Sequence, residues 1–275
     1  MSRTFALTVA AVALVAAPVA AHDYWLLPEK FVAKPGEEVP THLYYGDDFV
    51  PENERPYQKD RTPYFALVSA GGTVDLAATL TDGLRPAAAW RPGAPGTYLL
   101  VHDRNAQNIV LKGADFDRYL QEEGLEAIRA ERRRRGEDAK DGRERYSRSI
   151  KTLVQVGPTA DATATRQLNR PIEIVPLVNP YTLRPGQALT VRVFFEGKPL
   201  ADQQIDALHR QGNRTNRLSA RTDAAGQASF QLAEPGAWLL RLVHMERCRR
   251  DCAAVDWESF WSSLSFALPP APPTP

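Results

Sequence analysis

The sequence is poor in the residues that most often build metal and redox sites, with 2 cysteines, 2 methionines and 5 histidines among 275 residues. No two histidines have the i, i+4 or His-x-His spacing of a local metal motif, so any metal site must be assembled by tertiary structure. The chain also lacks Gly-x-Ser-x-Gly, His-Glu-x-x-His and a glycine-rich phosphate loop. We therefore predict that it is not an enzyme.

Two further absences limit the choice of partner. With 34 Lys+Arg against 33 Asp+Glu, the chain has no charge excess of the kind that nucleic-acid and membrane-surface proteins carry, and no nucleic-acid partner is expected. Beyond residue 21 no run of 18 apolar residues occurs, so no membrane span is expected after that point.

The one long apolar run lies at the N-terminus and has the form of a secretory signal. Arg3 precedes an apolar stretch over residues 5–17, and Val19-Ala20-Ala21 supplies small residues where a signal peptidase reads them. The run is shorter than the roughly 18 to 20 residues that span a bilayer, so cleavage after Ala21 is expected rather than anchoring. We predict residues 1–21 as a signal peptide and a periplasmic or secreted mature protein.

Cleavage after Ala21 would make His22 the first residue of the mature chain. An α-amine and an imidazole on one residue can chelate a transition metal through two nitrogens, because a metal readily deprotonates an amine whose pKa is near 8. The cofactor predicted is a divalent transition metal: nickel, cobalt or copper. The alternative is an accidental histidine, since cleavage sites tolerate nearly any residue here.

Two pairs of similar segments indicate an internal repeat. PGEEVPTHLYY at 35–45 aligns without a gap with PGQALTVRVFF at 185–195, and both show the period-two pattern of a half-buried strand. PGTYLLVH at 95–102 matches PGAWLLRLVH at 235–244. Chance similarity among Pro-Gly turns is the alternative. The repeat predicts a mainly β fold of two tandem immunoglobulin-like β-sandwich units, the first with a short helical insert.

Composition sets the predicted boundaries: an N-terminal β-rich domain at 22–157, a linker at 158–170, a C-terminal immunoglobulin-like sandwich at 171–268 and a proline-rich tail at 269–275. Helical apolar spacing predicts the insert near 115–135, which Gly124 ends or bends. The charged segment 129–148 that follows is expected to be a solvated loop or a frayed helix end. Within it, Arg132 to Arg135 form either an anion patch or, as nearby acids favour, a solubilising surface.

Several motifs are similar to those of a known family. They are AHDYWLLP after the signal segment, FDRYLQEEGL, RYSRSIKTLVQVG, GKPL followed by RTDAAGQASF, GAWLLRLVHM and DWESFWSSLSF. On these motifs the chain resembles an exported bacterial family of unknown function, commonly described as periplasmic components of nickel/cobalt uptake systems. The resemblance implies a role in handling these metals, with an inner-membrane metal transporter as a partner. Cys248 and Cys252 depart from the family pattern.

Three histidines are the candidate metal ligands. His22 supplies the chelate, and His244 or His102 would add an imidazole from a neighbouring strand. Strand alternation places His244 on the face of Trp238 and Leu242, where a buried histidine without a metal is the alternative. His102 has the corresponding place in the first unit.

Cys248 and Cys252 are predicted to form a disulfide, since a cysteine pair in an oxidising compartment is most often bonded. In a flat strand their Cα atoms would lie about 13 Å apart, beyond the roughly 4.4 to 6.8 Å of a disulfide, so the segment between them must turn. A soft-metal site of both thiolates and His244 is the alternative.

Three classes of function remain. The first is a periplasmic protein that binds nickel, cobalt or copper through His22. The second is a non-catalytic carbohydrate- or protein-binding sandwich, which exposed aromatic residues such as Trp90, Trp257 and Trp261 would favour. The third is a copper oxidase or oxygenase with an N-terminal histidine brace, which needs a second histidine and an open coordination position.

Overall fold

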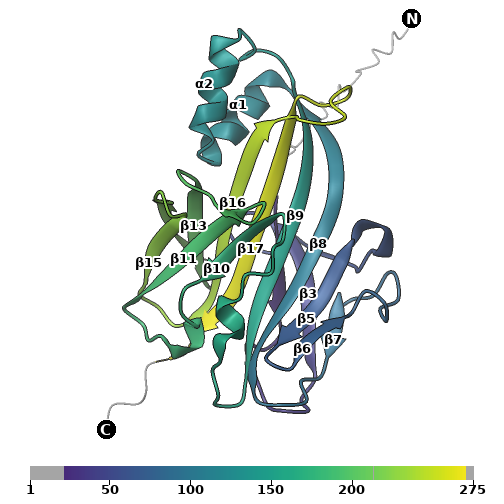
Figure 1. The fold of residues 1–275 in the computed structure, drawn as a ribbon, viewed down its shortest axis with the longest axis vertical. Coiled ribbons are helices and arrows are strands. Elements are labelled where there is room, and N and C mark those ends of the chain that lie inside the picture. Colours follow the sequence, from purple (N-terminus) through teal and green to yellow (C-terminus); the bar gives the residue numbers. More distant parts are fainter. Residues whose placement is uncertain (1–21, 213, 271–275) are drawn as a thin grey trace, which may run out of the picture.

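The computed structural model describes residues 22–212 and 214–270, and the predicted signal peptide and most of the predicted tail lie outside these ranges. Within them the chain forms one nine-stranded sheet, two four-stranded sheets and two helices (Figure 1). None of the helices described is long and apolar enough to span a bilayer.

The large sheet contains, in spatial order, β14 (Arg214–Arg221), β13 (Gln204–Gln211), β16 (Gly236–Arg247), β17 (Trp257–Leu268), β9 (Gly142–Val156), β8 (Gly96–Leu111), β5 (Tyr64–Ser69) and β6 (Gly72–Asp75), with β2 (Val32–Ala33) paired to β9. The first small sheet contains β1 (Asp23–Pro28), β3 (Val39–Gly46), β4 (Asn53–Arg55) and β7 (Ala88–Trp90). The second contains β10 (Ile172–Pro176), β11 (Gln187–Phe195), β12 (Lys198–Pro199) and β15 (Gln227–Leu232). Helices α1 (Gly113–Glu122) and α2 (Glu126–Arg134) join β8 to β9, and short 3-10 turns occur at Lys59–Arg61, Ala162–Thr165 and Pro180–Thr182.

The strand pairing repeats between the two halves of the chain. The aligned segments form β3 and β11, and each is the central strand of a small sheet: β3 pairs with β1, β4 and β7, and β11 pairs with β10, β12 and β15. In the large sheet, β8 pairs with β5 and β9 as β16 pairs with β13 and β17. The prediction of a mainly β fold made of two tandem sandwich units is confirmed.

The two units share their large sheet, which the sequence did not predict. The corresponding strands β9 and β17 run parallel and paired, from Trp257 opposite Glu144 to Ser265 opposite Thr152. The joined strands form the long central sheet seen in Figure 1, with the helices at one of its ends.

Alternate side chains of the large sheet enter different cores. Leu100 of β8 packs in one cluster with Leu43 of β3, whereas its neighbours Leu99 and Val101 pack in another with Leu189 of β11. Because successive strand residues point to opposite faces, the two small sheets cover opposite faces of the large one.

In the second half, alternating apolar positions between turn signals predict six strands, at 172–178, 188–195, 204–210, 228–232, 238–245 and 259–267. All six are present, as β10, β11, β13, β15, β16 and β17, and β12 and β14 are additional. Segment 158–170, the predicted linker, is tied to the first unit, since Asp161 accepts a hydrogen bond of 2.9 Å from the backbone of Thr97. Two helices occupy the predicted insert, and Gly124 lies between them with a φ of 64°.

The expectation for segment 129–148 holds for residues 133–140, which are mostly exposed, but is wrong for Arg132 and for the residues from Gly142 onward. Strand β9 begins at Gly142, and two of the charged residues are buried: Arg132 is 2% exposed and Glu144 also 2%. The Arg132 guanidinium lies over the Phe116 ring and donates to the carbonyl of Lys140 at 2.6 Å. Tertiary contacts therefore bury these two residues, although the segment itself has few apolar residues.

The cysteine prediction is confirmed. Cys248 and Cys252 are joined, with their Cα atoms 5.7 Å apart, in a turn between β16 and β17. Both sulfurs are thereby removed from the alternative thiolate metal site with His244.

Glu144 makes the stability of the protein dependent on pH. Burial raises the pKa of this carboxyl from 4.5 to about 7, and its oxygen accepts hydrogen bonds from the hydroxyls of Tyr119 and Ser259. A carboxyl whose folded pKa is raised stabilises the fold below its unfolded pKa, and this stability is lost as pH rises through the folded value. Between pH 5 and 8 its contribution should fall by roughly 2 to 3 kcal/mol.

We expect Glu144→Gln, which cannot ionise, to remove this part of the pH dependence. Urea unfolding at pH 5 and 8 should show the variant gaining roughly 2 to 3 kcal/mol relative to the wild type as pH rises. Glu122→Gln, on the exposed side of α1, is the control and should follow the wild type. A variant that keeps the full pH dependence would contradict the assignment to Glu144.

Candidate metal centre

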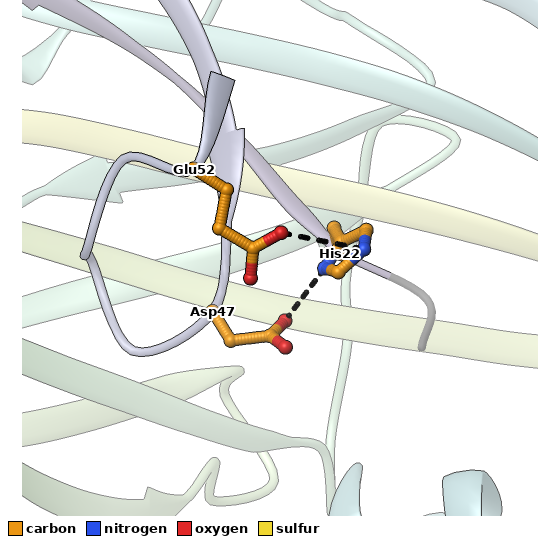
Figure 2. Close-up of side chains that lie close together, drawn as sticks. All are labelled: His22, Asp47 and Glu52. Atoms are coloured by element: carbon orange, nitrogen blue, oxygen red, sulfur yellow. Dashed lines mark hydrogen bonds and ion pairs between the residues drawn. The ribbon is translucent and has the colours of Figure 1, made fainter. Parts of the chain in front are cut away.

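Three side chains with metal-ligating atoms meet at one end of the first small sheet. His22, Asp47 and Glu52 each offer one atom such that all three atoms lie within 4.8 Å of one another, and they form the one group of this kind in the described part of the chain. Figure 2 shows both carboxylates beside the imidazole, each joined to it by a dashed line. Its Nδ1 is 3.2 Å from Asp47 Oδ1, and its Nε2 is 3.7 Å from Glu52 Oε2.

The two carboxylates lie at either end of the tight loop that joins β3 to β4. The loop turns back on itself through hydrogen bonds from Val50 N to Asp47 O (2.8 Å) and from Glu52 N to Tyr45 O (3.0 Å). Gly46 is required at its start, because a Cβ there would lie 2.1 Å from the Val50 carbonyl oxygen.

Two residues of β14, in the second unit, hydrogen-bond to this loop. Thr215 donates to the carbonyl of Asp48 at 2.7 Å, and the guanidinium of Arg217 reaches the Asp48 carboxylate at 2.6 Å. Between the two carboxylates, the Phe49 side chain is 2% exposed and packs against Trp25. The spacing of Asp47 and Glu52 is therefore determined by contacts on both sides of the loop.

His22 is held just before the first residue of β1. Its ring lies 5.2 Å from that of Tyr45, measured between centroids, and its carbonyl accepts a hydrogen bond of 3.2 Å from Arg148. The next residue, Asp23, is buried and pairs with Arg241 at 2.7 Å. The imidazole is 28% exposed and the carboxylates are about half exposed, so an ion could reach them from solvent.

The donor set suits a divalent first-row metal. Bonds of about 2.0 to 2.2 Å place two ligands of one ion about 3 to 4 Å apart, close to the separations found here. A single ion cannot use both ring nitrogens. Nδ1 is the nitrogen that can form a chelate ring with the α-amine of His22, and Asp47 lies beside Nδ1. Glu52 would then accept the proton on Nε2 and orient the ring.

The other two predicted ligands lie elsewhere. His102 is 0% exposed, contacts the Phe65 ring and is 3.0 Å from the Thr62 hydroxyl. His244 packs against Phe195, and its Nδ1 is 3.1 Å from the Gln203 amide oxygen. Burial lowers the pKa of His102 to about 3 and that of His244 to about 4. The structure brings neither of them into the group with His22, and it places both as neutral, packed histidines.

The remaining two histidines also lie outside the group. His42 lies between Glu54 (2.8 Å) and Glu29 (3.3 Å), which contact opposite ring nitrogens. His209 is buried at 2% exposure against Trp238.

The tryptophans cited for a binding face are not exposed. Trp90, Trp257 and Trp261 are 5%, 1% and 4% exposed, so this expectation was wrong. Their rings are part of the apolar clusters beneath the sheets, and the carbohydrate- or protein-binding alternative loses the observation that favoured it.

Sequence reasoning missed Asp47 and Glu52. Asp47 belongs to an Asp-Asp pair that resembles ordinary loop charge, and nothing local connects it to a histidine 25 residues earlier. The signal that could have found them is the strand pairing. If the strand that follows His22 pairs with residues 39–46, the loop after residue 46 must lie beside His22.

The corresponding place in the second unit has different residues. The repeat alignment and the hydrogen bond from Glu196 N to Pro171 O put Arg170 and Gly197 where the first unit has His22 and Asp47. The group is therefore specific to the first unit rather than a by-product of the fold.

Comparison with known proteins identifies the family but no function. Among solved structures, the D0-D1 domain of Intimin matches at 13% identity over 88% of this chain and 96% of that one, with a TM-score of 0.20, too low to support any argument. No curated protein matches. The family model described as "Domain of unknown function (DUF4198)" matches residues 19–246. The chain therefore belongs to the DUF4198 family, a family of unknown function.

Proposed function

We propose that the mature protein is exported and binds a divalent transition metal, nickel, cobalt or copper, at its N-terminal histidine. The observation that supports this most strongly is the pair of carboxylates beside the imidazole of the residue that signal cleavage would expose. In this proposal the α-amine and Nδ1 of His22 and the Asp47 carboxylate bind the ion, and Glu52 orients the ring. The nickel/cobalt association implied by the sequence resemblance makes metal uptake, with a transporter as partner, the role we favour.

The surroundings support binding rather than oxidation chemistry. A histidine brace needs a second imidazole, and in the described residues the group that contains His22 adds only carboxylates. Oxygen ligands and an exposed position suit an ion that must be taken up and released. Copper should bind most tightly to nitrogen ligands whatever metal the cell supplies, so affinity in vitro does not identify the physiological metal.

Calorimetry with Ni²⁺ and with Cu²⁺ tests the site. We expect the protein that begins at His22 to lose roughly 10- to 100-fold in affinity on Asp47→Asn, and at least as much on His22→Ala or on addition of one N-terminal residue, which turns the amine into an amide. Glu54→Gln, an acid on β4 outside the group, is the matched control and should bind as the wild type does. Equal affinity for all forms would overturn the proposal.

A further inference from the structure

Three arginines beside the candidate metal centre have no acidic partner. In the described part of the chain, Arg55, Arg104 and Arg148 have no carboxylate within 4.0 Å, whereas 13 of the other 23 arginines do. The protein supplies them with few hydrogen-bond acceptors: Gln58 for Arg104 (2.8 Å) and the His22 carbonyl for Arg148 (3.2 Å). One nitrogen of each guanidinium is buried without a partner.

Aromatic rings connect these arginines to one another and to His22. The Arg148 and Arg104 guanidiniums lie 4.3 and 5.4 Å from the centroid of the Tyr24 ring. Arg55 lies 4.2 Å from the centroid of Tyr45. The Tyr45 ring contacts both Tyr24 and His22, at centroid distances of 5.7 and 5.2 Å. We call Tyr24, Tyr45, Arg55, Arg104 and Arg148 the arginine cluster.

The like charges of the cluster are close enough to affect one another. Burial lowers the pKa of Arg104, and the charges of Arg148, Arg61 and Arg55 lower it further. Tyrosine rings attract the guanidiniums but do not neutralise them. Each guanidinium group is a planar set of N–H donors, and some of these donors have no acceptor in the described part of the protein. Carboxylates complement this geometry, because they accept paired hydrogen bonds from a guanidinium group.

The site thus has two neighbouring ends of opposite charge. Asp47 and Glu52 lie beside the ring nitrogens of His22 and suit a cation, whereas the arginine cluster contacts His22 through its backbone carbonyl and the Tyr45 ring and suits an anion. A metal ion bound to an organic polycarboxylate has charges complementary to those of the site, with the cation at one end and unused carboxylates at the other. The flat aromatic surface between the arginines would contact the carbon skeleton of such a ligand.

We propose that the arginine cluster binds the carboxylates of an organic polycarboxylate that chelates the metal, so that the protein takes up the metal as an anionic chelate rather than as a bare ion. This inference rests on the proposed function for its metal end, whereas the anion end stands on the arginines alone. The two parts can therefore fail separately.

Calorimetry in a buffer free of carboxylates tests the two ends. The probes are citrate alone, Ni²⁺ alone, Ni²⁺ with citrate, and inorganic phosphate. We expect citrate to bind the metal-free protein and to lose at least 10-fold in affinity when Arg55→Gln and Arg104→Gln are combined, with Ni²⁺ alone bound as before. Arg192→Gln, on β11 in the second unit, also removes an arginine with a buried unpartnered nitrogen. It is the matched control and should bind citrate as the wild type does.

Citrate affinity equal in the double variant and the control would overturn the cluster as an anion site, and phosphate bound as tightly as citrate through the same arginines would overturn the polycarboxylate assignment. Citrate binding without any Ni²⁺ binding would refute the metal proposal and leave the anion site standing. Arg104→Lys, which keeps the charge and loses the planar fork, should weaken citrate binding less than Arg104→Gln, and this separates recognition from a folding defect.

Discussion

Replacing Arg241 with methionine is expected to lower the free energy of unfolding by about 3 to 5 kcal/mol, since removing one partner leaves buried charges uncompensated. Arg241 is 5% exposed and contacts two buried carboxylates, Asp23 at 2.7 Å and Asp206 at 3.3 Å, and the largely buried carboxylate of Glu123 at 2.6 Å. These come from β1, from the end of α1 and from β13. A single guanidinium therefore joins the residue next to His22, the helical insert and the second unit.

The measurement is urea unfolding at pH 8, above the pKa of about 7 to which burial raises Glu123. Arg217→Met is the control and should cost no more than about 1 kcal/mol. Arg217 contacts the same Asp206 at 3.1 Å but is 40% exposed, and Arg241 still compensates this buried carboxylate. Adding Asp23→Asn and Glu123→Gln to Arg241→Met should recover much of the loss. A loss below about 1 kcal/mol for Arg241→Met would show that solvent, not Arg241, compensates these acids.

Phe49→Ala should lower the unfolding free energy by about 3 to 5 kcal/mol, the usual cost of truncating a buried aromatic side chain. Phe49 is 2% exposed and packs with Trp25, Leu208 and Leu239, so its removal leaves a cavity between the two units. Because the same residue anchors the loop that carries Asp47 and Glu52, Ni²⁺ affinity should also fall, by roughly 10-fold as for loss of an orienting partner.

The matched control is the next residue in the loop. Val50 is 43% exposed, and Val50→Ala should change unfolding by less than about 0.5 kcal/mol and leave Ni²⁺ binding unaltered. Chemical unfolding and calorimetry on the same preparations measure both effects. Loss of stability with full metal affinity would mean that the loop keeps its shape without its apolar anchor.

The sequence by itself determined the features that depend on residues close together in the chain. Alternating apolar positions predicted the strands of the second half because one face of each strand is buried. The repeat predicted two sandwich units, and the short spacing of Cys248 and Cys252 allowed a bond between them. The place of His22 directly after a signal-like segment pointed to the end of the chain where the metal-ligating group lies.

Only the tertiary structure decided which residues meet. Asp47 and Glu52 approach His22 because β1 pairs with β3, and strand pairing depends on contacts far apart in the sequence rather than on local composition. The parallel pairing of β9 and β17 buried Glu144 in a segment whose composition indicated a solvated loop. His102 and His244 had the right residue type for metal ligands, but His102 is buried against Phe65 in the first unit and His244 is half-buried against Phe195 in the second. Side-chain chemistry can be read residue by residue, whereas burial and proximity depend on how whole sheets pack.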